Sequence, residues 1–110
     1  MFIREWRGRA KQSGAARYPE YFRKELISQL RSAPGFQGGS LSQREVGDQV
    51  EFLVLTRWKS MDAIREFTGS AAEHAVMDPG AMATLEAYDH AVRHYEVLED
   101  LWQPRSPPEA

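Results

Sequence analysis

The sequence predicts an α+β domain in which one antiparallel sheet carries its helices on a single face. Three observations lead to this fold class. Residues 52–55 are four consecutive apolar residues, the length and composition of a buried strand. Apolar residues recur at helical spacing before this strand, over residues 18–30, and after it, over residues 61–67. Strand-like segments lie at both ends of the chain, so strands and helices alternate along it.

The first two elements follow from apolar spacing and from two breaking residues. Residues 1–10 are expected to begin as a strand, with Phe2, Ile3 and Trp6 as its apolar residues and Gly8 as its end. A helix of about four turns is expected next, with Pro19 in its first turn, where a missing N–H costs nothing. Its apolar stripe is expected to consist of Tyr18, Phe22, Leu26 and Leu30.

A hairpin is expected in the middle of the chain. Residues 36–46 predict a bulged or edge strand, because Gly38 and Gly39 weaken its interior. Gly47 and Asp48 supply the turn into a central strand that ends at Trp58. Ser60 then caps a helix over residues 61–67. The sequence therefore predicts a buried strand that leads directly into an amphipathic helix.

The last third of the chain has weaker periodicity. We expect a short helical turn over residues 71–76, a break at residues 78–80, another turn over residues 82–85, and a last strand over residues 89–98. Residues 1–100 are expected to form a single domain. Residues 101–110 hold three of the six prolines and are expected to form a mobile tail.

This order of strand, helix, strand, strand, helix and strand is the split βαβ of ferredoxin-like domains, with a four-stranded antiparallel sheet. Both helices would then cover one face of the sheet. Because the central strand is apolar on both sides, its second face also needs a cover. A second copy that presents the same face is the simplest cover, so we expect a homodimer closed sheet to sheet.

Composition excludes several function classes. The net charge is -2 and the basic residues form no stripe, so no nucleic-acid partner is expected. The absence of cysteine excludes disulfides, thiolate metal sites and a cysteine nucleophile. No apolar run is long enough to span a membrane, and the charged N-terminus is unlike a signal peptide, so we expect a cytoplasmic protein without a membrane partner.

Four stretches of the sequence are similar to a known family: EWRG at residues 5–8, PGFQGG at 34–39, EFLVLTRWKSMDAIREFTG at 51–69 and HYEV at 94–97. Together they resemble the antibiotic biosynthesis monooxygenase superfamily of dimeric α/β barrels, and the resemblance covers residues 2–99. It implies a dimeric α/β barrel with a ligand cavity. Members with this fold include cofactor-independent oxygenases of polyketide phenols or quinols and haem-degrading enzymes, so the resemblance alone transfers no single activity.

The resemblance also assigns some positions. Trp58 matches a tryptophan that lines the pocket in the polyketide oxygenases, whereas Val54 and Ile64 stand where those enzymes have an asparagine and an aromatic residue. Haem-degrading members use an asparagine, a tryptophan and a histidine, and here those regions hold Arg7, Phe67 and a displaced His74. Haem degradation is therefore not expected.

The candidate residues for chemistry are a histidine and a set of aromatic side chains. His94, in the last strand, is the candidate general base, because an imidazole titrates near neutrality; the alternative is an interface histidine bonded to a carbonyl. His74 and Arg4 are candidates for stabilising an oxyanion, although an exposed His74 is the simpler reading of its segment. An aromatic slot for a flat ligand is expected from Tyr18, Phe22, Trp58 and Phe67, which could equally be plain core.

These residues support two main functional hypotheses. The first is a monooxygenase that acts on a planar phenol or quinol without metal or organic cofactor, with His94 as base. The second is a dimeric module that binds a small aromatic ligand without turnover. Lyase or isomerase chemistry by the same base is a third possibility. The histidines lie in different elements, so we expect no metal site.

Overall fold

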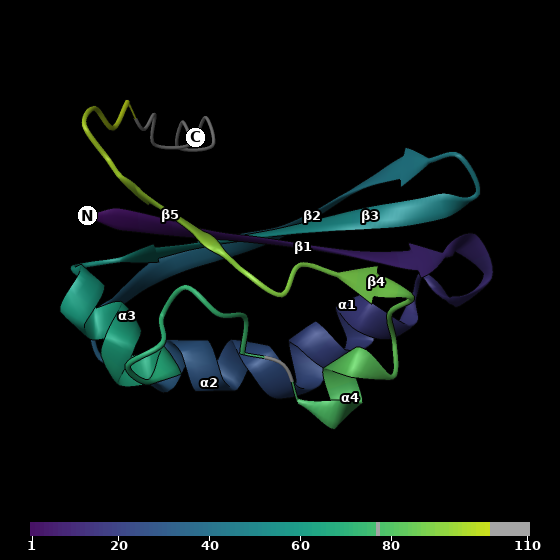
Figure 1. Cartoon of the computed structure of the whole chain (residues 1–110), viewed down its shortest axis with the longest axis horizontal. Helices are drawn as coiled ribbons and strands as arrows, with labels where there is room; N and C mark the ends of the chain where they lie inside the picture. The colour runs from purple at the N-terminus through teal and green to yellow at the C-terminus, as the bar shows by residue number, and fades with distance from the viewer. Residues whose placement is uncertain (77, 102–110) are drawn as a thin grey trace, which may run out of the picture.

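The computed structural model describes residues 1–76 and 78–101, and its elements follow the predicted order (Figure 1). The first strand, β1 (Phe2–Lys11), leads through a 3₁₀ turn, η1 (Gln12–Gly14), into a helical run. That run consists of α1 (Arg17–Tyr21), a π-helical segment η2 (Phe22–Leu26) and α2 (Ile27–Ser32). It matches the predicted helix of about four turns, with a π-helical middle that the apolar spacing does not show.

The predicted hairpin forms in the middle of the chain. Strands β2 (Phe36–Val46) and β3 (Gln49–Trp58) pair antiparallel, and Val46 lies opposite Gln49 across a two-residue turn. Gly47 adopts a φ of 61° there, a conformation that favours glycine. β2 is an edge strand with a bulge between Phe36 and Gly38, as predicted.

The helix after β3 also begins where the sequence predicts. In α3 (Met61–Thr68), Ser60 is the N-cap and its hydroxyl accepts a hydrogen bond from the amide of Ala63 at 3.1 Å. β3 lies inside the sheet, between β2 and β1. The central strand and its following helix are therefore arranged as the sequence predicts.

The last third of the chain differs from the prediction. Residues 71–76 form no helical turn, and residues 78–80 do not break the chain, because Asp78 caps a short helix, α4 (Pro79–Met82). The expected strand over residues 89–98 is wrong in its extent, since β4 (Ala87–Tyr88) and β5 (Arg93–Glu96) pair with β1 separately. The chain leaves the sheet between them, where the amide of Val92 donates to the carbonyl of Glu73.

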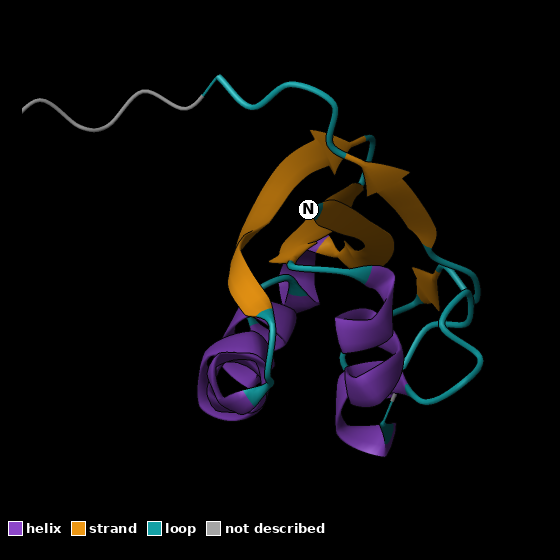
Figure 2. Cartoon of the chain, turned by 90° about the vertical axis from the view of Figure 1, so that its left-hand side faces the viewer, coloured by secondary structure: helices purple, strands orange, loops and turns teal. Residues whose placement is uncertain are grey.

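The architecture is a ferredoxin-like α+β fold with an antiparallel sheet. The order along the sheet is β2-β3-β1-β4, and β5 also pairs with β1. Figure 2 shows the helices together on one side of the curved sheet. The expected tail lies outside the described residues from residue 102 onward.

The two faces of the sheet differ in composition. Alternate residues of β1 and β3 face the helices and form the core, among them Trp6, Phe52 and Trp58. The face away from the helices is only partly apolar. Leu53 and Leu55 lie in its middle, but Glu51 on the same face forms ion pairs with Arg9 and Arg44. The central strand therefore has apolar residues on both faces, as expected, but arginines and a glutamate occupy part of the outer face of the sheet.

Candidate functional site

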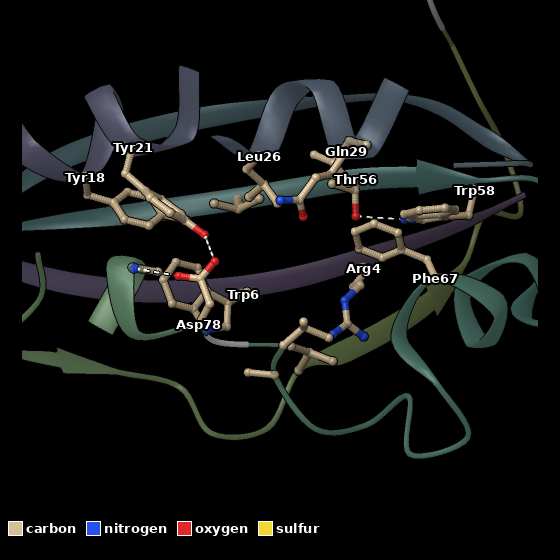
Figure 3. A pocket seen from close by; sticks show the side chains of 16 residues that line it. Arg4, Trp6, Tyr18, Tyr21, Leu26, Gln29, Thr56, Trp58, Phe67 and Asp78 are labelled. Atoms are coloured by element: carbon tan, nitrogen blue, oxygen red, sulfur yellow. Dashed lines mark hydrogen bonds between the residues drawn. The ribbon is translucent and has the colours of Figure 1, made fainter. Parts of the chain in front are cut away.

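A cavity of about 110 Å³ lies between the sheet and the helices. Figure 3 shows the side chains that point into it, which come from β1, β3, the first helical run, α3 and the segment before α4. Its aromatic walls consist of Trp6, Tyr18, Tyr21, Trp58 and Phe67. Its polar side chains are Arg4, Gln29, Thr56 and Asp78. The cavity thus has the apolar wall with a few polar groups that is typical of small-molecule sites.

Trp58 is held rigidly at one end of the cavity. Its side chain is fully buried, and its indole N–H donates to the hydroxyl of Thr56, two residues earlier on the same strand, at 2.8 Å. Phe67 comes from α3 and packs on the Trp58 ring with a centroid distance of 5.2 Å. Because β3 continues directly into α3, the local sequence alone brings these two rings near each other.

Trp6 and Tyr18 wall the other half of the cavity. Their ring centroids are 5.5 Å apart, and the Trp6 indole N–H donates to the carbonyl of Asp89 at 3.0 Å. Gly8 does not end β1 as expected but lies within it, where a Cβ would come within 2.7 Å of the Trp6 ring. The glycine therefore provides the space in which the Trp6 ring lies.

Arg4 is a buried cation in the cavity wall. Its side chain is 8% exposed, and its Nη1 donates to the carbonyl of Ala72 at 2.5 Å. Its Nη2 donates to the carbonyl of His74 at 3.1 Å. Burial lowers the pKa of Arg4 to about 10, so the guanidinium remains charged near neutral pH.

His94 lies beside Arg4, because the two residues are directly opposite in the β1–β5 ladder. Nη1 of Arg4 is 2.9 Å from Nε2 of His94, and since a guanidinium can only donate, Nε2 is the acceptor. Burial and the charge of Arg4 hold the pKa of His94 below its ordinary value. The imidazole is therefore neutral at pH 7, with its proton on Nδ1.

A tyrosine and a carboxylate meet at the mouth of the cavity. The hydroxyl of Tyr21 donates to Oδ2 of Asp78, and the Oδ1 atom of Asp78 accepts from the amide of Ala81. The hydrogen bond from Tyr21 and the one from Ala81 hold the pKa of Asp78 below its ordinary value, so it is ionised at neutral pH. Figure 3 shows Tyr21 and Asp78 at one end and Trp58, Phe67 and Arg4 toward the other.

The structure brings together only some of the residues that the sequence singles out. Tyr18, Trp58, Phe67 and Arg4 line the cavity. Phe22 is buried in the core but is not among the lining side chains. The side chain of His74 is exposed, and only its backbone carbonyl contacts Arg4. His94 touches Arg4 and is not itself a lining residue.

Sequence reasoning did not assign Trp6, Thr56 or Asp78 to the site. Alternation along β1 and β3 would have placed Trp6 on the face of Arg4, and Thr56 on the face of Trp58. No local pattern indicates Asp78, because it reaches the cavity only through packing of α4 against α1.

Two kinds of feature are absent from the described residues. In residues 1–76 and 78–101, no three histidine or acidic side chains lie close enough together to hold a metal ion. None of the helices described is both long and apolar enough to cross a membrane.

Several solved structures share this fold. A Bacillus cereus protein assigned provisionally as an antibiotic biosynthesis monooxygenase has a TM-score of 0.65 and 23% identity, over 94% of this chain and 98% of its own. SnoaB, a cofactor-independent oxygenase from Streptomyces nogalater, has a TM-score of 0.60 and 14% identity, over 93% and 98%. The heme-degrader MhuD from Mycobacterium tuberculosis, with two hemes bound, has a TM-score of 0.57 and 19% identity, over 91% and 99%. At these identities the likeness shows the fold alone.

Sequence comparison identifies the family. No curated protein matches the chain. The family model described as antibiotic biosynthesis monooxygenase matches residues 1–79, which include β1, the hairpin, α3 and the segment that contacts Arg4. The chain therefore belongs to the antibiotic biosynthesis monooxygenase family.

Proposed function

We propose that this protein is a monooxygenase that acts on a planar, electron-rich aromatic such as a phenol or quinol without metal or organic cofactor. The observation that carries the proposal is the aromatic cavity with the buried Arg4 in its wall, where Arg4 is hydrogen-bonded to the partly buried His94. Family membership and the fold shared with SnoaB, a cofactor-independent oxygenase, agree with this chemistry.

In the proposed reaction the substrate itself reduces O₂. Deprotonation makes the ring electron-rich enough to give an electron to O₂, and the resulting pair combines to a peroxide at a ring carbon. Loss of water leaves a carbonyl at that carbon. The substrate thus loses two hydrogens, one from the carbon and one from its hydroxyl group, and gains one oxygen atom, while the second oxygen leaves as water. The aromatic walls orient the ring and exclude bulk water.

His94 and Arg4 share the deprotonation step. His94 is neutral and can take a proton, but its Nε2 lone pair is occupied by Arg4. We propose that Nη1 of Arg4 turns from His94 to the substrate oxygen as that oxygen loses its proton. The base then becomes available at the moment when the guanidinium begins to stabilise the oxyanion. His74 takes part only through its carbonyl, which holds Arg4 in place.

O₂ consumption with a panel of single-ring phenols and quinols tests this proposal. His94→Gln should lower the rate by roughly 10²- to 10⁴-fold, the usual contribution of a general base. His90→Gln is the matched control, because His90 is exposed and does not line the cavity. Equal rates for the two variants would show that His94 is not the base. Product formed in the absence of O₂ would instead indicate lyase or isomerase chemistry.

A binding module without turnover is the second candidate. It is favoured by two polar side chains of the cavity that are already bonded to neighbouring side chains, since Thr56 accepts from Trp58 and Asp78 accepts from Tyr21. Val54 also lies in the wall where the polyketide oxygenases have an asparagine. Thermal stabilisation by a ligand that yields no product in air would support this candidate over the enzyme.

The cavity does not fit a haem. Ligand pockets usually measure about 300–1,000 Å³, well above the 110 Å³ of this cavity. No histidine is among the residues that line it in the described part of the chain, so a haem there would have no imidazole ligand. We therefore do not propose that the likeness to MhuD extends to its ligand.

We also propose that the protein is a homodimer closed through the outer face of the sheet. Leu53 and Leu55 lie on this face, away from the helices, and remain partly exposed in the single chain. The charged groups around them are already paired, as Glu51 is with Arg9 and Glu5 with Arg7. A second copy would cover the leucines without leaving these charges unpaired. A mass of only 12.6 kDa by light scattering would contradict this assembly.

A further inference from the structure

Arg4 has no negatively charged partner in the part of the chain that the structure describes. Its hydrogen bonds go to two backbone carbonyls and to a neutral imidazole. No carboxylate of residues 1–76 or 78–101 forms an ion pair with it. Every other arginine that lies on the sheet and forms an ion pair is more exposed than Arg4, for example Arg9. Burial of a single unpaired charge is costly, and proteins normally offset it with an opposite charge.

The guanidinium also has donors left to use. Of its five N–H groups, three are engaged, which leaves Nε–H and one N–H on Nη2 without an acceptor among the described residues. No fully buried polar side-chain atom there lacks a partner, so Nε is at least slightly accessible to a solute. Each of these two N–H groups can donate to an anionic oxygen, and a guanidinium binds a carboxylate most strongly through two such donors.

The rest of the cavity limits what the ligand can be. Its volume of about 110 Å³ is of the order of the 150 Å³ apolar cavity that holds one benzene ring. The carboxylate of Asp78 at the other end repels an anion, so an anionic group is favoured only at the Arg4 end (Figure 3). Trp58 and Phe67 provide flat surfaces for the ring next to Arg4.

We infer that the cavity selects single-ring aromatic anions, carboxylate or phenolate, whose charged oxygen accepts hydrogen bonds from the free N–H groups of Arg4. This inference rests on the proposed function only in placing the ligand in the same cavity. It adds the requirement that the bound ligand is negatively charged, which the proposed oxygenation does not need. The ligand carries its negative charge, or acquires it, in the ground-state complex. Neutral rings of the same shape bind more weakly.

A ligand series on the wild-type protein tests the inference without any substitution. Isothermal titration should show benzoate binding roughly tenfold to a hundredfold more tightly than the isosteric, neutral benzamide, the range expected for hydrogen bonds to a charged group. 4-Nitrophenol supplies the phenolate arm, because its visible absorbance reports ionisation directly. Binding should raise its ionised fraction at fixed pH.

The benzoate and 4-nitrophenol measurements together show whether the cavity prefers a carboxylate or a phenolate. Preference for benzoate without added ionisation of 4-nitrophenol assigns a carboxylate ligand, and the reverse result assigns a phenolate. Benzamide binding as tightly as benzoate, with no change in 4-nitrophenol, would overturn the inference, and so would no binding of any of the three compounds.

Substitution then assigns the selectivity to one residue. Arg4→Met keeps the apolar stem and should abolish the preference for the anion, whereas Arg4→Lys, the variant more able to fold, should retain part of it. Arg31→Met, at an exposed arginine in α2, should behave as wild type. O₂ consumption is measured separately. Anion selectivity without turnover would support this inference and contradict the proposed oxygenase activity. Turnover of neutral rings without anion selectivity would support the oxygenase activity and overturn this inference.

Discussion

The hydroxyl of Tyr21 lies 2.5 Å from Oδ2 of Asp78, and this hydrogen bond joins the first helix to the start of α4 across 57 residues of sequence. The other oxygen of the same carboxylate caps α4, 2.9 Å from the amide of Ala81. One side chain therefore lies at one end of the cavity (Figure 3), caps a short helix and contributes a negative charge to the site.

Asp78→Ala should remove the cap and the contact with Tyr21 together. The loss of an N-cap costs about 1 kcal/mol of stability, and the exposed hydrogen bond to Tyr21 adds less than that. Asp78→Asn, which keeps an oxygen for capping, should recover most of the loss. Urea unfolding measures both, with Asp62→Ala as the control, since Asp62 is almost fully exposed. Equal losses for Asp78→Ala and Asp62→Ala would contradict the capping role.

Thr56→Val should destabilise the site that holds Trp58. The substitution preserves shape but leaves the indole N–H of a fully buried tryptophan without its acceptor, which costs about 1–3 kcal/mol. Thr56→Ser keeps the acceptor and should cost less. Thr68→Val, where the hydroxyl forms only an exposed hydrogen bond, is the matched control. A melting temperature that is lower for Thr56→Ser than for Thr56→Val would refute this account.

His94 should make the folded protein sensitive to mild acid. Its pKa is lower folded than unfolded, because of burial first and Arg4 second. Above the unfolded value near 6.5 both states are neutral and His94 adds no pH dependence. Below it the unfolded chain takes up the proton first, so stability falls as pH falls from that value toward the folded pKa.

A pH series of melting temperatures measures this effect. The fall between neutral pH and pH 5 should be smaller for His94→Gln, whose side chain can still accept from Arg4 but cannot be protonated. His90→Gln should follow the wild-type curve, and a His94→Gln curve parallel to wild type would show that His94 does not titrate differently on folding.

Leu55→Arg should dissociate the proposed homodimer. Leu55 lies on the outer face of the sheet between Ser40 of β2 and Glu5 of β1, so an arginine there would place a charge in the middle of the interface. An unpaired buried charge costs about 3–5 kcal/mol, enough to halve the mass seen by light scattering at micromolar concentration. Ser28→Arg on the exposed face of the helical run should leave the mass unchanged.

The sequence by itself determined the elements whose signals are local. The apolar run of β3, the turn at Gly47, the hydroxyl cap at Ser60 and the helical spacing of α3 are contained in a few consecutive residues, and each appears in the structure where it was predicted. These elements already place Trp58 and Phe67 side by side. The order of elements then limited the topology to a ferredoxin-like sheet.

Tertiary structure alone decided how the charged groups of the site meet their partners. Arg4 meets His94, 90 residues later, only because β5 pairs with β1 in one register, and a shift of one residue would have turned His94 to the other face. Asp78 reaches Tyr21 through packing of α4 on α1, and the last strand divides because the chain leaves the sheet to bond residues 73–75. Contacts of this kind depend on long-range pairing and packing, which leave no periodic pattern in neighbouring residues, so no local signal predicts them.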